Sequence, residues 1–276
     1  MDKAILITGC SSGIGHYCAV NLHKRGYRVF ATARNNEDVT ALKALGLNAL
    51  QLDLNDSKSI NDAVKTVLNE TGGNLYALFN NGAYGQPGAV EDLTRDTLRK
   101  QFETNVFGWL ELTNLLLPQM RKHNRGRIIQ NSSVLGLVAM PFRGAYNASK
   151  FAIEGLTDTL RIELIDTDIQ VSLIEPGPIE SQFRANALVA LKENIDIDKS
   201  HFKDDYKDSI GRLDAKTSNN KFCLQPEAVY VKLIHALEAK KAKPRYYVTF
   251  PTHLFAFLRR VLPVSLLDKI LARAAS

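Results

Sequence analysis

Two side chains that could move a proton, Tyr146 and Lys150, stand four residues apart in the sequence. Positions i and i+4 of a helix lie on the same face, so the lysine ammonium can stand beside the tyrosine phenol. A free tyrosine has a pKa of about 10, and a fixed positive charge beside it favours the phenolate and lowers that pKa. The spacing therefore predicts that Tyr146 donates or accepts a proton near neutral pH.

This spacing also occurs by chance on surface helices, so the catalytic interpretation depends on a second motif. A glycine-rich turn near the N-terminus follows an apolar strand and opens a helix. Its residues include Gly9, Ser11, Ser12, Gly13, Ile14 and Gly15. Glycine lets the backbone approach a pyrophosphate, and the helix N-terminus faces the negative charge. The turn predicts a dinucleotide site, although its spacing is G-x-x-x-G-x-G and not the usual G-x-G-x-x-G.

The residues after the next two strands indicate which dinucleotide. NAD enzymes place an acidic residue at the end of the second strand, where it binds the ribose 2′-hydroxyl. Here Ala33 takes that place and Arg34 follows it. A guanidinium suits a 2′-phosphate, so we expect NADP(H). Asp53, at the end of the third strand, could accept a hydrogen bond from the adenine amino group.

Apolar runs alternate with helical patterns along the first 175 residues. Predicted strands cover residues 4–7, 28–33, 48–53, 76–80, 127–131 and 169–175, and predicted helices cover 13–25, 36–45, 56–70, 95–123 and 144–166. Such alternation implies a parallel sheet with right-handed crossovers. We therefore expect an α/β fold built on a single Rossmann-type, doubly wound parallel sheet.

Residues 1–250 would form the dinucleotide-binding catalytic domain, and two stretches depart from its pattern. Residues 178–225 are polar and follow a strand end, so we interpret them as a mobile substrate lid, with a decorative insertion as the alternative. Residues 251–276 carry apolar side chains at helical spacing, broken by Pro263, and predict a helical extension of the same domain. This extension could pack on the body or make a peripheral membrane contact through residues 252–276.

Charge is distributed unevenly along the 276 residues, whose net charge is +6. Residues 240–276 hold eight basic side chains and one acidic side chain, so the rest of the chain is nearly neutral. Because nucleic-acid binding needs a basic face on the body, we expect no nucleic-acid partner. Contact of the basic tail with anionic lipid stays open.

The cysteines and histidines indicate a reducing compartment and no metal. Cys10, Cys18 and Cys223 match neither a zinc site nor a disulfide framework, so we interpret them as free thiols. The histidines are dispersed without a ligand pair. A strand beginning at Ala4 leaves no room for a signal peptide, and no segment has the ~20 apolar residues that span a bilayer. We expect a cytoplasmic protein, with membrane association through the tail left open.

Together these motifs resemble those of the short-chain dehydrogenase/reductase family over about residues 3–250. The opening turn is similar to the family's Thr-Gly-x-x-x-Gly-x-Gly. Residues 80–83 (Asn-Asn-Gly-Ala) resemble its Asn-Asn-Ala-Gly with the last two residues transposed, and we expect the backbone there to be preserved. Residues 176–179 (Pro-Gly-Pro-Ile) resemble its Pro-Gly turn after strand six, with Ser181 where threonine is common.

The resemblance implies a catalytic set of Asn105, Ser133, Tyr146 and Lys150. Ser133 would donate to the substrate carbonyl, Tyr146 would deliver the proton, and Lys150 would lower the pKa of Tyr146 and hold the nicotinamide ribose. Asn105 would fix a water that returns protons. Beyond the glycine-rich turn, Arg34 and Asp53, the implied cofactor contacts are Asn81, Tyr146, Lys150, Pro176, Gly177 and Ile179.

Apolar side chains between Ser133 and Tyr146 predict a pocket for an apolar carbonyl or alcohol substrate. They are Val134, Leu135, Leu137, Val138, Met140 and Phe142, with Tyr84 and Phe183 at the same edge. The competing interpretation is that half of them belong to the core. They do not distinguish a fatty aldehyde from a retinoid or a steroid.

Within the family, the chain resembles bacterial NADP-dependent aldehyde reductases and the 17β-hydroxysteroid and retinol dehydrogenases. We therefore expect NADP(H)-dependent reduction of apolar aldehydes or ketones to alcohols, with a hydroxysteroid or retinol dehydrogenase as the alternative. A non-catalytic NADP(H)-binding regulator is less favoured, because all four catalytic positions are filled. The resemblance also implies a homo-oligomer through helices 95–123 and 144–166.

Overall fold

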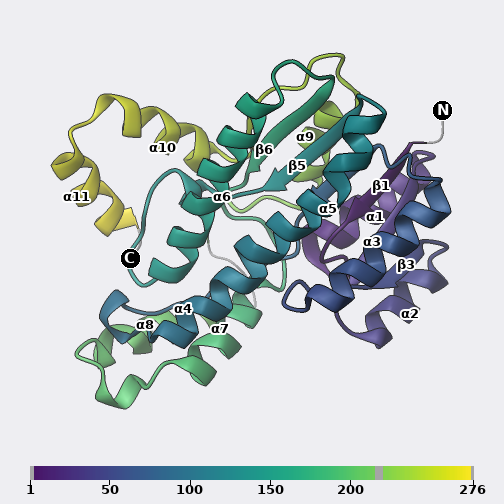
Figure 1. Ribbon diagram of the computed structural model, residues 1–276. Helices are drawn as coiled ribbons and strands as arrows, with labels where there is room; N and C mark the ends of the chain where they lie inside the picture. The colour runs from purple at the N-terminus through teal and green to yellow at the C-terminus, as the bar shows by residue number, and fades with distance from the viewer. Residues whose placement is uncertain (1–2, 215–219, 275–276) are drawn as a thin grey trace.

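The computed structural model describes residues 3–214 and 220–274, and this part of the chain forms a seven-stranded parallel sheet (Figure 1). The strands are β1 (Ala4–Ile7), β2 (Arg28–Ala33), β3 (Asn48–Gln51), β4 (Ala77–Asn80), β5 (Gly126–Asn131), β6 (Ile169–Glu175) and β7 (Arg245–Tyr247). Their order is β3-β2-β1-β4-β5-β6-β7. The predicted doubly wound parallel sheet is confirmed. The sequence did not indicate β7, because its three residues contain no apolar run.

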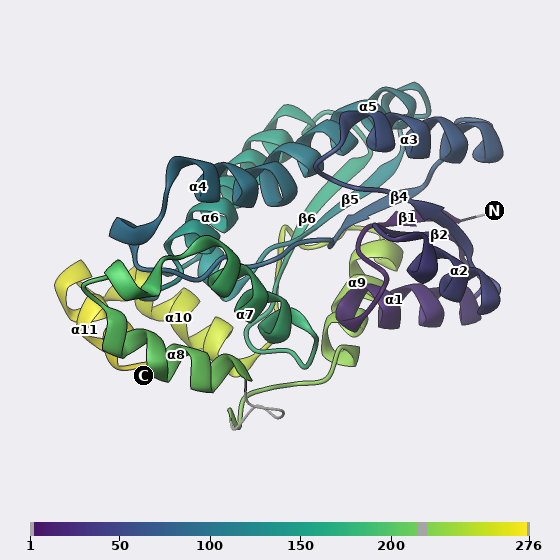
Figure 2. The same cartoon turned by 90° about the horizontal axis from the view of Figure 1, so that it is seen from below.

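Helices cover both faces of the sheet, with α3, α5 and α6 on one side and α1, α2 and α9 on the other (Figure 2). The helices are α1 (Gly13–Lys24), α2 (Asn36–Ala44), α3 (Ser57–Thr71), α4 (Arg95–Phe102), α5 (Gly108–Lys122), α6 (Gly144–Glu163), α7 (Phe183–Asn194), α8 (Lys203–Asp214), α9 (Glu227–Glu238), α10 (Phe250–Val261) and α11 (Val264–Ala274). The hydrophobic core follows from this layering. Ile5 and Ile7 of β1 pack in the cluster under α1 and α9, whereas Leu6 packs in the cluster under α3 and α5. A strand buried on both faces needs such a continuous apolar run.

The helix predicted over residues 95–123 is interrupted by a π-helical turn, η2 (Glu103–Phe107), between α4 and α5. Such turns are frequent at functional sites, and this one contains the buried Asn105. Gly108 follows it because a Cβ at this position would lie 2.2 Å from the backbone oxygen of Leu54. The close contact holds the start of α5 against the loop after β3.

The proposed lid, residues 178–225, is largely helical where it is described, and its residues 215–219 lie outside the described part of the chain. It contains α7, the 3-10 turn η4 (Ile197–Lys199) and α8. Leu191, Ile195 and Tyr206 form a small core there, which the polar composition did not indicate. The Tyr206 hydroxyl donates to Asp92 Oδ2 at 2.7 Å and accepts from the Ala89 N–H at 2.7 Å. These bonds tie α8 to the loop after β4, and the mobility of the lid stays a prediction.

The C-terminal extension forms α10 and α11, which meet at Pro263 as the sequence predicted, while residues 275–276 lie outside the described part. Phe255, Leu267 and Leu271 pack against Val134 and Leu135 of the loop after β5. In Figure 1 the two helices extend from the body beside α6. Among the described residues, no helix is long and apolar enough to cross a bilayer.

Candidate active site

The glycine-rich turn joins β1 to α1 and adopts the backbone that its glycines predicted. Gly9 has a φ of 70° and Gly13 a φ of 55°, both in the left-handed region that favours glycine. A Cβ on Gly15 would lie 2.1 Å from the backbone oxygen of Gly9, and a Cβ on Gly9 would lie 2.5 Å from the Cα of Gly82. Three neighbouring segments therefore meet at distances that only glycine permits.

Asn81 locks this turn to the end of β4. Its side-chain amide donates to the backbone oxygens of Thr8 at 2.9 Å and Gly9 at 3.2 Å. Thr8 Oγ1 in turn accepts the backbone N–H groups of Asn81 and Gly82, both at 2.8 Å. Gly82 stands where the family motif has alanine, and a Cβ there would lie 3.1 Å from the Gly9 nitrogen. The transposed glycine thus accommodates the close approach of the two loops.

The surroundings of the turn fit a dinucleotide. β1 and β4 are neighbours in the sheet while β2 lies on the other side of β1, so the turn stands where the strand order reverses, which is where such folds bind ligands. Ser12 is the N-cap of α1, yet its side chain makes no capping bond, and Ser11 and Ser12 are both exposed. The first N–H groups of α1 and these hydroxyls could therefore bind a pyrophosphate.

The two residues predicted to hold the adenosine half lie at the neighbouring strand ends. Arg34 follows β2 and is exposed, and its backbone oxygen accepts the Gln51 amide at 3.2 Å. Asp53 follows β3 and is half-buried, with Oδ1 accepting the Asn55 N–H at 2.9 Å. Pro176, Gly177 and Ile179 come from the opposite side, directly after β6.

The proposed catalytic side chains gather beyond the ends of β4, β5 and β6. Lys150 is 1% exposed, and its Nζ donates to the backbone oxygen of Asn131 at 2.8 Å. The same Nζ lies 4.5 Å from the ring centre of Trp109 and 5.6 Å from that of Tyr146. Ser133 is buried and its Oγ accepts the Leu135 N–H at 3.1 Å. The predicted helix face thus places lysine beside tyrosine.

The expected effect of Lys150 on the pKa of Tyr146 is not what the structure shows. Burial raises the pKa of Tyr146 above its usual value, and a hydrogen bond with Ser133 only partly offsets this. Burial also lowers the pKa of Lys150 to about 7, with Glu154 acting in the opposite direction. Burial of the phenol outweighs the effect of a neighbouring ammonium, which is why the sequence argument failed here.

Asn105 lies in the π-helical turn and fixes the loop after β4. Its Oδ1 accepts the Tyr84 N–H at 3.2 Å, and its Nδ2 donates to the Tyr84 oxygen at 3.0 Å and to Ser149 Oγ at 3.1 Å. Its side chain is thus committed to protein partners on both sides. Ser149 belongs to α6, so Asn105 couples the loop to the helix that carries Tyr146 and Lys150.

The apolar residues predicted to line the pocket separate into three groups. Val134, Leu135 and Val138 are buried against α10 and α11, as the core alternative proposed. Phe142 packs on the lid, with its ring centre 5.4 Å from Phe202. Its φ of 58° is strained for a bulky side chain and lies in the loop before α6. The remaining predicted wall residues are Tyr84, Leu137, Met140 and Phe183.

Phe183, the first residue of α7, packs on Tyr146. Its ring centre lies 5.3 Å from that of Tyr146 in an edge-to-face contact. A Cβ on Gly85 would lie 2.7 Å from the Phe183 ring, so the ring rests directly on this glycine. The first residue of α7 therefore lies beside Tyr146, and its role as part of a substrate pocket stays a prediction.

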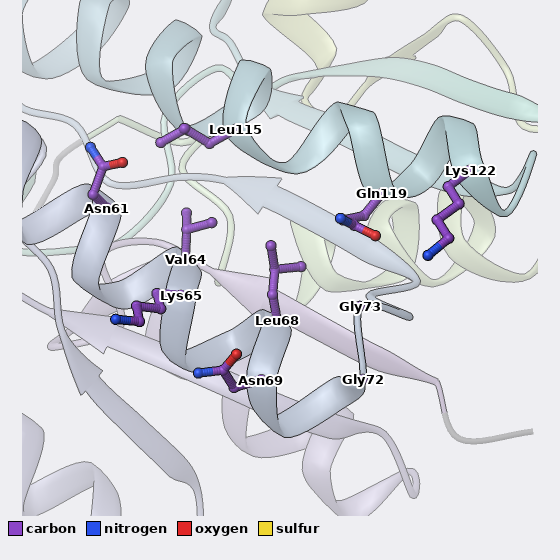
Figure 3. A pocket seen from close by; sticks show the side chains of 10 residues that line it. All are labelled: Asn61, Val64, Lys65, Leu68, Asn69, Gly72, Gly73, Leu115, Gln119 and Lys122. Atoms are coloured by element: carbon purple, nitrogen blue, oxygen red, sulfur yellow. The ribbon is translucent and has the colours of Figure 1, made fainter.

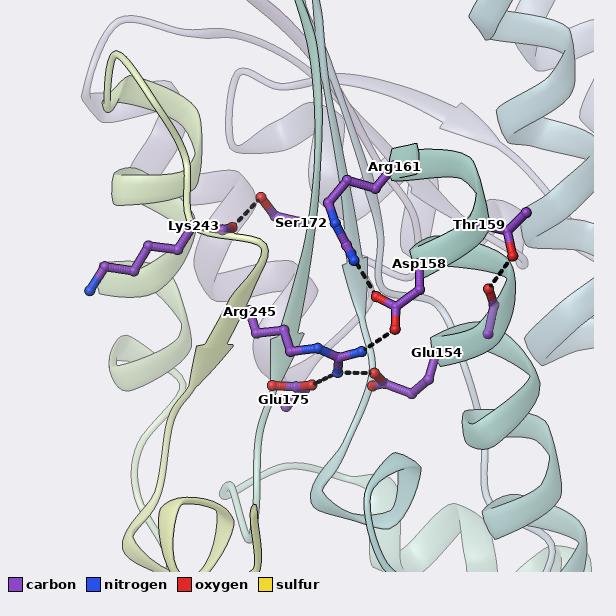
Figure 4. Close-up of polar contacts among 9 residues, drawn as sticks. Glu154, Asp158, Thr159, Arg161, Ser172, Glu175, Lys243 and Arg245 are labelled. Atoms are coloured by element: carbon purple, nitrogen blue, oxygen red, sulfur yellow. Dashed lines mark hydrogen bonds and ion pairs between the residues drawn. The ribbon is translucent and has the colours of Figure 1, made fainter. Parts of the chain in front are cut away.

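A partly buried charge cluster between α6, β6 and β7 was not recognised in the sequence (Figure 4). Arg245 of β7 forms ion pairs with Glu154, with Glu175 at 2.5 Å and with Asp158 at 2.6 Å. Glu154 Oε1 and Glu175 Oε2 are buried without a partner, and burial raises the pKa of both carboxyls. Glu154 lies one turn after Lys150, and Glu175 directly precedes the Pro-Gly turn. No local pattern marks these residues, because α6, β6 and β7 meet only in the fold.

One open groove lies away from the predicted site residues, and a second borders the charge cluster. One runs between α3 and α5 and is lined by residues such as Val64, Leu68 and Gln119 (Figure 3). The other lies between α6, β7 and α10 and includes Phe151, Arg245 and Arg259. The first contains none of the predicted site residues, and we assign it no role.

Comparison with known proteins identifies the family. Residues 3–190 match the model of the short chain dehydrogenase family. The chain is 40% identical over 271 residues to the uncharacterized oxidoreductase YbbO of Escherichia coli (strain K12), a match that covers 98% of this chain and 94% of that protein. It is 34% identical over 257 residues to human 17-beta-hydroxysteroid dehydrogenase type 1, covering 89% of this chain and 77% of that protein.

Solved structures agree with this family. A single-residue variant of actinorhodin polyketide ketoreductase, solved with NADPH, superposes with a TM-score of 0.72 at 26% identity, covering 90% of this chain and 95% of that chain. Other structures with this fold carry NADP or NAD. The family match, the relatives and the shared fold lead to one conclusion: the chain belongs to the short-chain dehydrogenase/reductase family of oxidoreductases.

Proposed function

We propose that this protein reduces apolar aldehydes or ketones to alcohols with NADPH. The observation that carries the proposal is the grouping of Ser133, Tyr146 and Lys150 beside a glycine turn that fits a dinucleotide, under the aromatic wall of Phe183. The bound dinucleotide would supply the hydride. The chain's own residues would bind the carbonyl, exclude water and provide the proton.

We infer the role of each side chain from the family motif together with its contacts. Ser133 would donate a hydrogen bond to the substrate oxygen, where negative charge develops. Tyr146, whose pKa is held high by burial, would act as a proton donor in the reducing direction. Lys150, whose pKa is lowered to about 7, could pass a replacement proton to Tyr146 at neutral pH. Asn105 would hold the loop after β4 in place against α6, in addition to its expected role in fixing a water.

The preference for NADP(H) rests on the end of β2. Arg34 is exposed there, and no acidic residue occupies the preceding position, which is Ala33. A guanidinium can bind a 2′-phosphate through two hydrogen bonds, whereas it has no partner of equal charge on NADH. The family as a whole uses either cofactor, so this proposal depends on Arg34.

The alternative is a hydroxysteroid or retinol dehydrogenase. The human relative of that kind is 34% identical, and the aromatic side chain of Phe183 beside Tyr146 suits a steroid or retinoid as well as a fatty aldehyde. A non-catalytic NADP(H)-binding regulator is less favoured, because all four proposed catalytic positions are filled and Lys150 is buried at a cost that pure binding does not require.

The direct test is oxidation of NADPH and NADH by the purified protein with aldehydes, retinal and ketosteroids, for the intact chain and for Tyr146→Phe. We expect turnover that prefers NADPH and disappears in Tyr146→Phe. Tyr230→Phe is the matched control, because its hydroxyl only contacts the Asn21 oxygen on α1 at 3.3 Å. Preference for NADH would contradict the assignment of Arg34. Tight NADPH binding without turnover of any carbonyl would favour the regulator.

We further propose a cytoplasmic homo-oligomer. The described cysteines are free, and two are buried, which fits a reducing compartment. Large apolar side chains are exposed on and beside the helices expected to pair, including Phe107, Leu110, Leu156 and Ile162. Surfaces of this kind mark protein contacts. Sedimentation velocity would show a dimer or tetramer, and a monomer at micromolar concentration would reject this proposal.

A further inference from the structure

Helix α10 presents a stripe of large apolar side chains to solvent. Phe250 is 60% exposed, Phe257 61% and Val261 54%, and Leu254 lies between them at 38%. At 100° per residue these four positions fall within roughly 60° of one another on the helix. The stripe therefore runs along one line of the helix surface.

The opposite face of α10 is the one that packs on the body. Thr252, Phe255 and Ala256 are buried, and Phe255 contacts the cluster that includes Val134 and Leu135 beside Ser133. Leu267 and Leu271 of α11 join the same cluster, and Tyr146 packs at its edge. The exposed stripe is thus turned away from the core. Folding alone does not require large apolar residues there, because the packed face already fixes the helix.

Basic residues lie beside the stripe on α10 and on the following helix. Arg260 lies beside it on α10, and Lys269 and Arg273 are exposed on α11. Asp268 is the single acidic residue after residue 240. Exposed apolar side chains bordered by arginine and lysine form the pattern of a helix that lies in a membrane interface.

We propose that α10 and α11 dock on the surface of an anionic phospholipid bilayer, with the Phe250–Val261 stripe inserted among the acyl chains and the basic residues on the headgroups. Charge complementarity favours lipid over a second copy of the chain. A symmetric pair would bring the same basic borders together, whereas anionic headgroups neutralise them. Because the packed face of α10 and α11 covers the loop that carries Ser133, docking would place the catalytic loop next to the bilayer.

The experiment is co-sedimentation of the full-length protein with vesicles of phosphatidylglycerol and phosphatidylcholine, compared with phosphatidylcholine alone. We expect binding to the anionic vesicles that weakens with salt. The double variant Phe257→Gln/Val261→Gln should bind at least tenfold more weakly, and Arg260→Gln should lose a few-fold. Val231→Gln is the matched control, since Val231 is 57% exposed on α9, outside the stripe and outside α10 and α11. It should bind like the unmodified chain.

Three results would overturn the proposal. The intact protein could leave anionic vesicles unbound, or the double variant could bind them as well as the control does. Sedimentation velocity without lipid could also show that the intact protein is an oligomer and the double variant a monomer. In that case this face joins copies of the chain. Thermal unfolding and NADPH binding establish that each variant is folded. The readout involves no turnover, so its failure is independent of the proposed reductase activity.

Discussion

Replacing Lys150 with methionine should abolish turnover and stabilise the protein at pH 7. Lys150 is 1% exposed, and its ammonium donates to the Asn131 oxygen at 2.8 Å and faces the rings of Trp109 and Tyr146. The lysine pKa falls from its ordinary 10.5 to about 7 because burial disfavours the charged form. Methionine has a similar length and no charge to desolvate.

The magnitude follows from the two pKa values. A fall from 10.5 to about 7 lowers the free energy of unfolding by about 4 kcal/mol at pH 7, where the buried lysine is half-protonated. The wild-type lysine also makes a hydrogen bond and a ring contact that methionine cannot make, and these add about 1–2 kcal/mol to the free energy of unfolding of the wild type. We therefore expect Lys150→Met to be more stable by about 2–3 kcal/mol, or roughly 4–12 °C in Tm for a chain of this size.

The sign of the pH dependence is equally defined. The pKa of Lys150 is lower in the folded state than in the unfolded state. Its burial therefore costs no stability above pH 10.5, and the cost grows as the pH drops towards 7. The advantage of Lys150→Met should therefore be largest at pH 7 and below, and disappear near pH 10.5. Lys65→Met, at an exposed position of α3, should show neither effect.

The assay is urea unfolding of the protein without cofactor at several pH values. The reasoning is wrong if Lys150→Met is less stable than the wild type at pH 7, or if the difference in their free energies of unfolding does not change with pH. Either result would mean that burial of Lys150 does not destabilise the folded protein. Loss of turnover with retained stability separates the catalytic role of Lys150 from any structural role.

Three further changes test other parts of the site. Gly15→Ala places a Cβ 2.1 Å from a backbone oxygen and should weaken NADPH binding at least ~10-fold by titration, whereas Gly155→Ala, which meets nothing within 4 Å, should leave binding unchanged. Arg245→Met leaves two buried carboxyls unpaired and should cost about 3–5 kcal/mol in urea unfolding at pH 9, a loss that shrinks as the pH falls to about 8 because the carboxyls take up protons; a loss independent of pH would contradict this. Phe183→Ala should raise the KM for long apolar aldehydes by a factor about ten times larger than the factor by which it lowers kcat. Equal changes in KM for short and long aldehydes would argue against an aromatic wall.

The sequence predicted those features that depend on local spacing. The i, i+4 relation of Tyr146 and Lys150 and the glycine turn are properties of short segments, and both were found as expected. The parallel sheet followed from alternating apolar runs, which parallel strands need on both faces.

What the sequence could not predict depends on residues that meet only in the fold. Trp109 lies under Lys150 although the two are far apart in the chain, and Arg245 reaches Glu154 from a strand that has no apolar signal. The direction of the Tyr146 pKa was wrong because a motif reports spacing but not burial, and burial outweighs the neighbouring lysine. The stripe on α10 is visible in sequence, but only the packed face shows which side is left outside.

The central claim is that Tyr146 donates the proton during reduction by NADPH. The most direct measurement is the single-turnover oxidation of bound NADPH by a saturating apolar aldehyde, in the wild type and in Tyr146→Phe, with NADPH affinity measured in parallel. We predict that Tyr146→Phe binds NADPH within about twofold of the wild type, since its ring remains, while the rate falls by about 10²–10⁴. A variant that oxidises NADPH within about tenfold of the wild-type rate would contradict the assignment of Tyr146.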